Sequence, residues 1–172
     1  PKSLIVSLRK KNLFFLLSIF FYSEIIIAQG TSTQNSLLNT ADSLFHSQQW
    51  RSAKEKYQQY LKDSVAKPMY WQRLGYCNHQ LGLYKDAISN YEKAMGLNPN
   101  PQLKFTIEAR MARSYARLGN EKEAMRWLEK ASTSGYQDIN EINRTKDFDL
   151  FKGSLLFNNL YKKIYTNAYP CS

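Results

Sequence analysis

The chain has 172 residues, enough for one domain with a sizeable hydrophobic core. Its 24 lysines and arginines exceed its 14 aspartates and glutamates, which gives a formal net charge of +10 at pH 7. This surplus favours anionic partners such as acidic peptides. The sequence has no zinc-finger or glycine-rich motif that would support nucleic-acid binding, so we expect no nucleic-acid partner.

Residues 1–28 have the layout of a secretory signal peptide. A basic flank that ends in Lys10 and Lys11 precedes an apolar run over 13–22, and Ala28 suits a cleavage site. We expect cleavage after Ala28 and export to the periplasm or to the outside of the cell. The alternative is an uncleaved anchor, the one route to membrane contact, although the apolar run is shorter than the ~20 residues that span a bilayer. The Ala-Gln ending resembles export signals of Gram-negative bacteria of the Bacteroidetes group.

Residues 34–67 predict two helices joined by a short turn. The small residue Ala41 lies in the first helix beside apolar residues such as Phe45. The second helix carries Ala53 and Tyr57 four residues apart, which places both side chains on one face.

Residues 68–101 predict a second helix pair with the same layout. Gly75 and Ala87 are small residues on consecutive helices, so the two axes can approach closely. Tyr91 supplies apolar area around that contact. Gly82 lies between the two apolar segments, where a residue in the left-handed conformation ends the first helix.

A third helix pair is predicted over 105–134, where Ala112 stands in the place of Gly75. The spacing from Ala53 to Ala87 is 34 residues, and the spacing from Ala87 to Ala124 is 37 residues. Recurrence at a nearly fixed spacing indicates a repeat protein rather than an isolated helical hairpin.

The middle pair resembles the tetratricopeptide repeat, whose pattern is W-x2-L-G-x2-Y, then A-x3-F, then a proline. The matching residues are Trp71, Leu74, Gly75, Ala87, Tyr91 and Pro99, whereas Asn78 replaces the tyrosine. The resemblance implies an all-α solenoid with about three helix–turn–helix repeats, over 34–67, 68–101 and 105–134, within residues 29–134. Such stacks usually bind another protein.

Residues 135–166 depart from the repeat and predict a C-terminal capping segment. Phe157, Leu160 and Ile164 fall at helical spacing, which indicates a last amphipathic helix. Residues 167–172 predict a tail or linker that contains Cys171. We expect no disulfide between this cysteine and Cys77, because Cys77 falls within the apolar pattern.

The first helix of each repeat lines the concave face of such a stack, so its polar positions are candidate partner-binding residues. Arg110, Arg113 and Arg117 recur at i, i+3 and i+7 and share one stripe. A guanidinium holds a carboxylate in two parallel hydrogen bonds, which favours a groove for a peptide with carboxylates. The alternative is a solvated helix face. The full candidate set is Gln72, Arg73, Tyr76, His79, Gln80, Arg110, Arg113 and Arg117.

The sequence predicts no catalytic residue, metal ligand or cofactor site. His46 and His79 lie on different repeats without the spacing of metal ligands. Neither a nucleophile motif nor a phosphate-binding glycine loop occurs. Asp147 and Asp149 are two residues apart, so on a helix they face different sides and make a poor acid–base pair.

The sequence is compatible with two functions. The first is an exported, non-enzymatic scaffold that binds a protein or peptide, with acidic character, in its concave groove. The alternative is an N-terminal helper domain of a larger exported protein or enzyme whose activity lies beyond residue 172.

Overall fold

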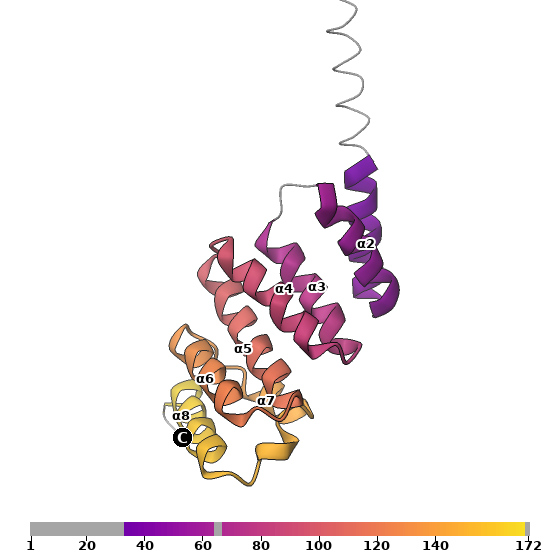
Figure 1. Ribbon diagram of the computed structural model, residues 1–172. Helices are drawn as coiled ribbons and strands as arrows, with labels where there is room; N and C mark the ends of the chain where they lie inside the picture. Colours follow the sequence, from indigo (N-terminus) through magenta and orange to yellow (C-terminus); the bar gives the residue numbers. More distant parts are fainter. Residues whose placement is uncertain (1–32, 64–66, 171–172) are drawn as a thin grey trace, which may run out of the picture.

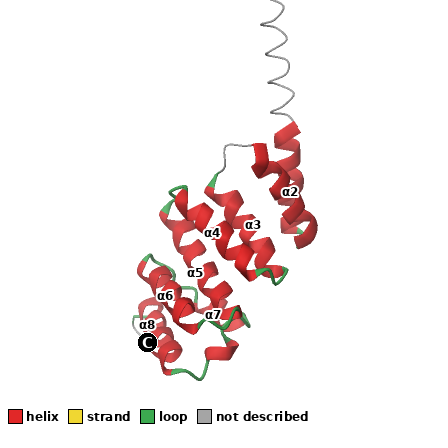
Figure 2. Cartoon of the chain, viewed as in Figure 1, coloured by secondary structure: helices red, strands yellow, loops and turns green. Residues whose placement is uncertain are grey.

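The computed structural model of the chain describes residues 33–63 and 67–170. Every regular element in these two ranges is a helix (Figure 2). None of the helices described is long and apolar enough to cross a membrane. The expected signal peptide and Cys171 lie outside the described residues.

The helices form antiparallel pairs that follow one another through the molecule (Figure 1). The pairs are residues 33–46 with α2 (Trp50–Asp63), α3 (Pro68–Gln80) with α4 (Tyr84–Gly96), and α5 (Pro101–Arg117) with α6 (Glu121–Thr133). Each helix from α2 to α5 packs against the next one in sequence, and α3 also contacts α5. This architecture confirms the predicted all-α solenoid.

Local sequence signals set the helix ends. Gly82 and Gly119 follow α3 and α5 with φ of 77° and 73°, a conformation that glycine adopts without steric cost. Helix α5 begins at Pro101, before the expected start of the third repeat. The Asn100 side chain caps it by accepting a hydrogen bond of 2.8 Å from the Leu103 amide, and proline at the first helical position needs no donor.

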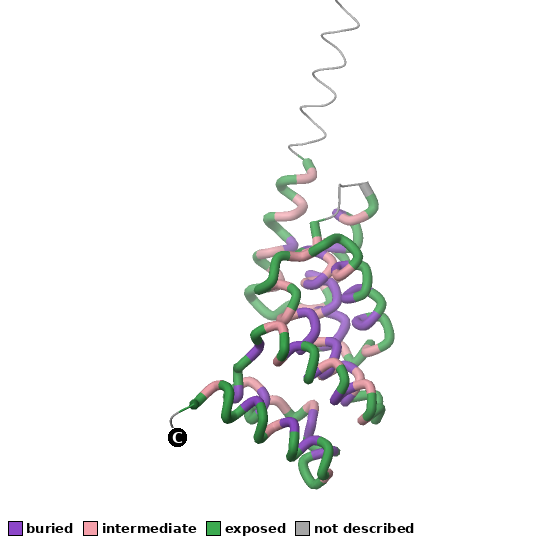
Figure 3. The backbone as a smooth tube through the Cα atoms, turned by 90° about the vertical axis from the view of Figure 1, so that its left-hand side faces the viewer, coloured by how far each residue is buried: buried purple, intermediate pink, exposed green. Residues whose placement is uncertain are grey.

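The core lies along the contact surfaces between successive helices, where the buried positions concentrate (Figure 3). One close helix–helix contact joins Gly75 of α3 to Tyr91 of α4. A Cβ atom at position 75 would lie 2.5 Å from the Tyr91 ring carbon Cε1, so the ring occupies the space that a side chain there would need. Glycine at this position therefore lets the fully buried tyrosine pack directly on the α3 backbone.

A capping segment covers the end of the third pair. It consists of α7 (Ile139–Arg144), the short 3₁₀ helix η1 (Asp149–Phe151) and α8 (Leu155–Ala168). Phe157, Leu160 and Ile164 of α8 are buried and share one apolar cluster with α5 and α6. Helix α7 has no counterpart among the expected elements. It is a short helix that the Asp138 side chain caps.

Candidate binding face

The candidate residues lie on α3 and α5, the first helices of the second and third pairs. Their polar side chains fall into three groups along the stack, and we call this surface the inner face. The first group joins the first pair to α3, the second is Arg110 with Tyr76, and the third joins α3 and α5 to the capping segment.

The first group centres on Asp42 of the helix over 33–46. Asp42 forms an ion pair with Arg73 of α3, and it accepts a hydrogen bond of 2.5 Å from the Tyr57 hydroxyl. The Arg73 guanidinium also lies 5.5 Å from the centre of the Phe45 ring. Arg73 therefore joins the first repeat to the second, and its charge is matched within the chain.

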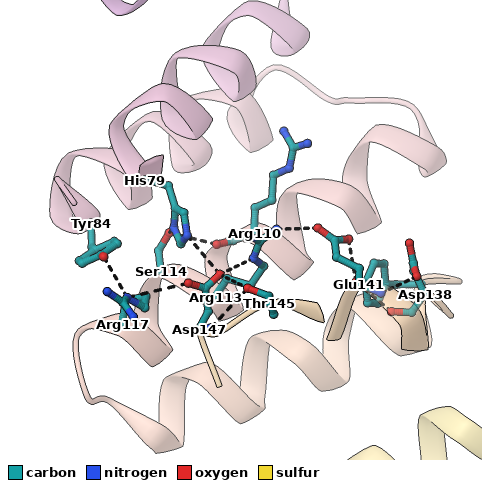
Figure 4. A network of polar contacts seen from close by, with 11 residues as sticks. His79, Tyr84, Arg110, Arg113, Ser114, Arg117, Asp138, Glu141, Thr145 and Asp147 are labelled. Carbon is teal, nitrogen blue, oxygen red and sulfur yellow. Dashed lines mark hydrogen bonds and ion pairs between the residues drawn. The ribbon is translucent and has the colours of Figure 1, made fainter. Parts of the chain in front are cut away.

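The third group centres on Asp147, which the capping segment places against α3 and α5 (Figure 4). Its Oδ2 accepts hydrogen bonds from Arg113 Nε at 2.6 Å and from Thr145 Oγ1 at 2.7 Å, and it lies 3.2 Å from His79 Nε2. Because a carboxylate oxygen can only accept, the Nε2–H group of His79 donates this hydrogen bond to Asp147 Oδ2. The other ring nitrogen, Nδ1, lies 2.9 Å from the Ser114 hydroxyl oxygen.

These partners decide the charge of Asp147. Burial alone would raise its pKa, because a buried carboxylate loses hydration. The hydrogen bond from His79 and the positive charge of Arg113 outweigh that effect and hold the pKa of Asp147 well below its usual range. Asp147 is thus a buried anion, and the capping segment supplies the counter-charge of the arginine stripe.

Two of the three arginines of the stripe, Arg113 and Arg117, form contacts of this kind. Arg113 reaches a second carboxylate, since its Nη1 lies 2.5 Å from Glu141 Oε1 of α7. Arg117 donates a hydrogen bond of 2.9 Å to the Tyr84 hydroxyl at the start of α4, and it lies 3.9 Å from Asp147. Both arginines therefore form contacts within the chain.

Arg110 differs from its neighbours on the stripe. Within the part of the chain that the structure describes, it forms no ion pair, and its guanidinium lies 4.2 Å from the centre of the Tyr76 ring. In Figure 4 the guanidinium points away from the Asp147 contacts. The side chain is half-buried, and this burial lowers the pKa of Arg110, although an arginine keeps its charge at neutral pH.

A pocket of about 340 Å³ lies next to Arg110, between α5 and the start of the capping segment. Its lining residues are Phe105, Thr106, Ala109, Arg110, Gly135, Tyr136, Gln137, Asp138 and Glu141. Of its two carboxylates, Glu141 is bound by Arg113 and by the Tyr136 hydroxyl at 2.9 Å, and Asp138 caps α7. Arg110 is thus the positively charged side chain among the residues that line this pocket.

The eight candidate residues do not form one open groove, which corrects the sequence expectation. Gln72 and His79 are buried, at 4% and 6% exposure, so neither is presented to a partner. Arg113 is also largely enclosed, because the capping segment lies on it. Gln80 is exposed at the end of α3, and Tyr76 and Arg110 remain together at the middle of the inner face.

Sequence reasoning missed Asp42, Asp147 and Glu141, the acidic partners of the arginines. One signal was available, since a stripe of arginines on a half-buried face needs counter-charges from elsewhere. Among the residues described, no group of three or more histidine, cysteine or acidic side chains could hold a metal ion.

Comparison with known sequences gives two matches to protein-family models. The model for subunit 3 of the anaphase-promoting complex, cyclosome, matches residues 18–94, and a tetratricopeptide-repeat model matches residues 109–134. A chloroplastic protein of Arabidopsis thaliana is 28% identical over 82 residues, which cover 48% of this chain and 24% of the relative. The chain therefore spans about a quarter of the length of that curated relative.

Several solved structures share the fold. MamA superposes with a TM-score of 0.63 at 17% identity, over 78% of this chain and 75% of that one. PcrH in complex with the chaperone binding region of PopB superposes with a TM-score of 0.53 at 17% identity, over 77% of this chain and 92% of that one. The TPR2AB-domain:pHSP90-complex of yeast Sti1 superposes with a TM-score of 0.54 at 18% identity, over 79% of this chain and 49% of that one. At these identities the likeness shows the fold alone.

Proposed function

We propose that this chain, which is a tetratricopeptide-repeat protein, is a non-catalytic scaffold that holds a peptide or protein partner on its inner face. The observation that carries the proposal is the state of Arg110. This cation is half-buried beside Tyr76, and in the described part of the chain it has no ion pair. The solved structures of PcrH and yeast Sti1 cited above each contain a segment of another protein, which agrees with this kind of role.

The partner group that Arg110 fits best is a carboxylate. A buried guanidinium gains most from an anion that pairs with two of its N–H groups at once. Its contact with the Tyr76 ring restrains the guanidinium, so less freedom is lost when the anion binds. We propose that the partner presents an acidic side chain or a free C-terminus here, with Tyr76 and Gln80 as further contacts.

We also propose that the protein is exported, on the basis of the signal-like residues 1–28. Expression of the chain in a Gram-negative host, followed by fractionation and N-terminal sequencing, tests this separately. A mature N-terminus at Gln29 in the periplasm or medium is expected. A protein that keeps residues 1–28 in the cytoplasm would contradict it.

Selection from a displayed library of random peptides, with free C-termini, tests the partner chemistry. The wild-type chain should enrich peptides that are rich in aspartate and glutamate or that depend on their terminal carboxylate. The best selected peptide should bind the Arg110→Ala variant about tenfold to a hundredfold more weakly, as expected for the loss of a charge-assisted hydrogen-bond pair. Arg110→Lys should recover only part of this loss, since lysine lacks the planar fork.

Arg51→Ala is the matched control, because Arg51 is an exposed arginine on α2. It should bind the selected peptide like the wild type. If the Arg110→Ala and Arg51→Ala variants bind the peptide equally well, Arg110 is not part of the binding surface. Thermal melting of both variants separates loss of binding from loss of fold.

A further inference from the structure

A cleft of about 870 Å³ lies between α2 and α4, where the first and second repeats meet. Helix α3 supplies its floor through Trp71, Leu74 and Asn78. Helices α2 and α4 form its walls, mostly through polar side chains such as Gln58, Asn90 and Lys93. It is larger than the pocket beside Arg110.

The cleft is separate from the inner face. Successive residues of a helix are turned by 100°, so Trp71, Leu74 and Asn78 share one side of α3, whereas Arg73 and Tyr76 share the opposite side. The second helices of the repeats border the cleft, and the first helices carry the arginines. An occupant of the cleft therefore need not compete with a partner bound at Arg110.

The third repeat shows why this space is open. Asn78 of α3 and Tyr115 of α5 occupy equivalent positions, three residues after Gly75 and Ala112. Tyr115 packs against the apolar clusters on both sides of the next repeat junction, which include Trp127. A tyrosine side chain thus lies between the second helices at that junction, and a shorter asparagine stands at the equivalent place here.

The base of the cleft carries an unpartnered polar group. Asn78 is 2% exposed, and its Oδ1 has no hydrogen-bond partner in the structure. This oxygen is closed off from solvent, so a bound hydroxyl recovers the cost of the unpaired amide, about 1–3 kcal/mol, when the Asn78 carboxamide turns toward the cleft. Leu74 and Trp71 give an apolar floor beside it, while the Lys93 ammonium lies 4.5 Å from the centre of the Trp71 ring. The covered indole face is therefore not a free platform for a sugar ring.

We propose that this cleft is a second binding site and that it takes a tyrosine side chain presented by a segment of a partner protein. The phenol ring would occupy the space that Tyr115 occupies at the next junction. Its hydroxyl would pair with the Asn78 carboxamide at the base. The partner would then contact the outer side of the stack as well as, or instead of, the inner face.

Nuclear magnetic resonance on the full 172-residue chain tests the site directly. N-acetyl-L-tyrosinamide is the probe, and N-acetyl-L-phenylalaninamide is the matched probe without the hydroxyl. We expect tyrosinamide to shift the Asn78 side-chain amide and Trp71 indole signals and to bind roughly threefold to tenfold more tightly than phenylalaninamide. Absence of shifts at these two residues, or equal affinity of the probes, would overturn the proposal.

A variant that fills the cleft from within gives a second test. Asn78→Tyr should abolish tyrosinamide binding, whereas Asn159→Tyr makes the same chemical change at an exposed site on α8 and should leave binding intact. Retained binding by a folded Asn78→Tyr variant contradicts the site. If that variant does not fold, the comparison of the two probes on the wild-type chain still decides the matter. Peptide binding at Arg110 is measured in parallel, so failure at either site is distinguished from failure at the other.

Discussion

At the residue scale, the close contact between Gly75 and Tyr91 determines how near α3 and α4 can approach. Gly75→Ala places a Cβ 2.5 Å from Tyr91 Cε1, and the buried ring has little room to move. We expect the free energy of unfolding to fall by about 1–3 kcal/mol, the usual cost of overpacking. Gly96→Ala is the control, since nothing lies within 4 Å of a Cβ at position 96. Denaturant titration of both variants measures the difference.

The third repeat suggests a compensating change for this pair. Ala112 and Leu128 are buried at the positions that Gly75 and Tyr91 occupy one repeat earlier. The double variant Gly75→Ala/Tyr91→Leu should therefore be more stable than Gly75→Ala alone. It also removes the buried Tyr91 hydroxyl, which has no hydrogen-bond partner. A double variant less stable than the single one would show that the loss arises elsewhere than at the ring.

Sequence could predict that Gly75 and Ala87 let α3 and α4 approach and that Tyr91 packs around them, but not the partners of the arginines. Small and large residues at a fixed spacing indicate where two helices approach, whereas the direct contact of Gly75 with the Tyr91 ring is a finding of the structure. The contact between His79 and Asp147 spans 68 positions. No local periodicity relates residues so far apart, and two aspartates near each other are equally typical of a solvated turn. The open face predicted for His79 and Arg113 was wrong for that reason.

At the element scale, charge holds the capping segment on α3 and α5. Asp147→Asn would leave Arg113 with one carboxylate and remove the anion that faces His79. We expect the free energy of unfolding to fall by about 3 kcal/mol at pH 7, as when one partner of a buried ion pair is removed. Asp149→Asn is the control, because Asp149 is half-exposed and pairs only with Lys152 one turn away. That change should alter stability by less than about 0.5 kcal/mol.

The same carboxylate makes stability depend on pH. The pKa of Asp147 is lower in the folded chain than its ordinary value of 3.8, so the unfolded chain binds the proton more readily. Its contribution is complete well above pH 3.8 and is lost as pH falls through the lowered folded value. Unfolding free energies measured between about pH 7 and about pH 2.5 should decline more steeply for the wild type than for Asp147→Asn. Parallel profiles would exclude Asp147 as the source of acid sensitivity.

At the scale of the whole molecule, the repeat pattern predicted the architecture because each helix packs mainly on its neighbours. The apolar clusters follow the stack in the same way. One cluster joins the first pair to α3, a second lies between α4 and α5, and a third joins α5 and α6 to the capping segment. A molecule built from neighbour contacts need not unfold as one unit, and a weakened end should open before the rest.

Local opening of this kind can be tested with two substitutions at opposite ends of the stack. Tyr57→Phe removes the hydroxyl bound to Asp42, and Phe148→Ala empties a site that is 1% exposed in the capping segment. In amide hydrogen exchange, the first should speed exchange in α2 and α3 while α8 keeps its protection. Phe148→Ala should lower the free energy of unfolding by about 3–5 kcal/mol. It should speed exchange in α6 and α8 and leave exchange in α2 unchanged. Each variant should change exchange at least about tenfold in its own region. Uniform acceleration along the chain by either variant would show that the stack unfolds as a single cooperative unit.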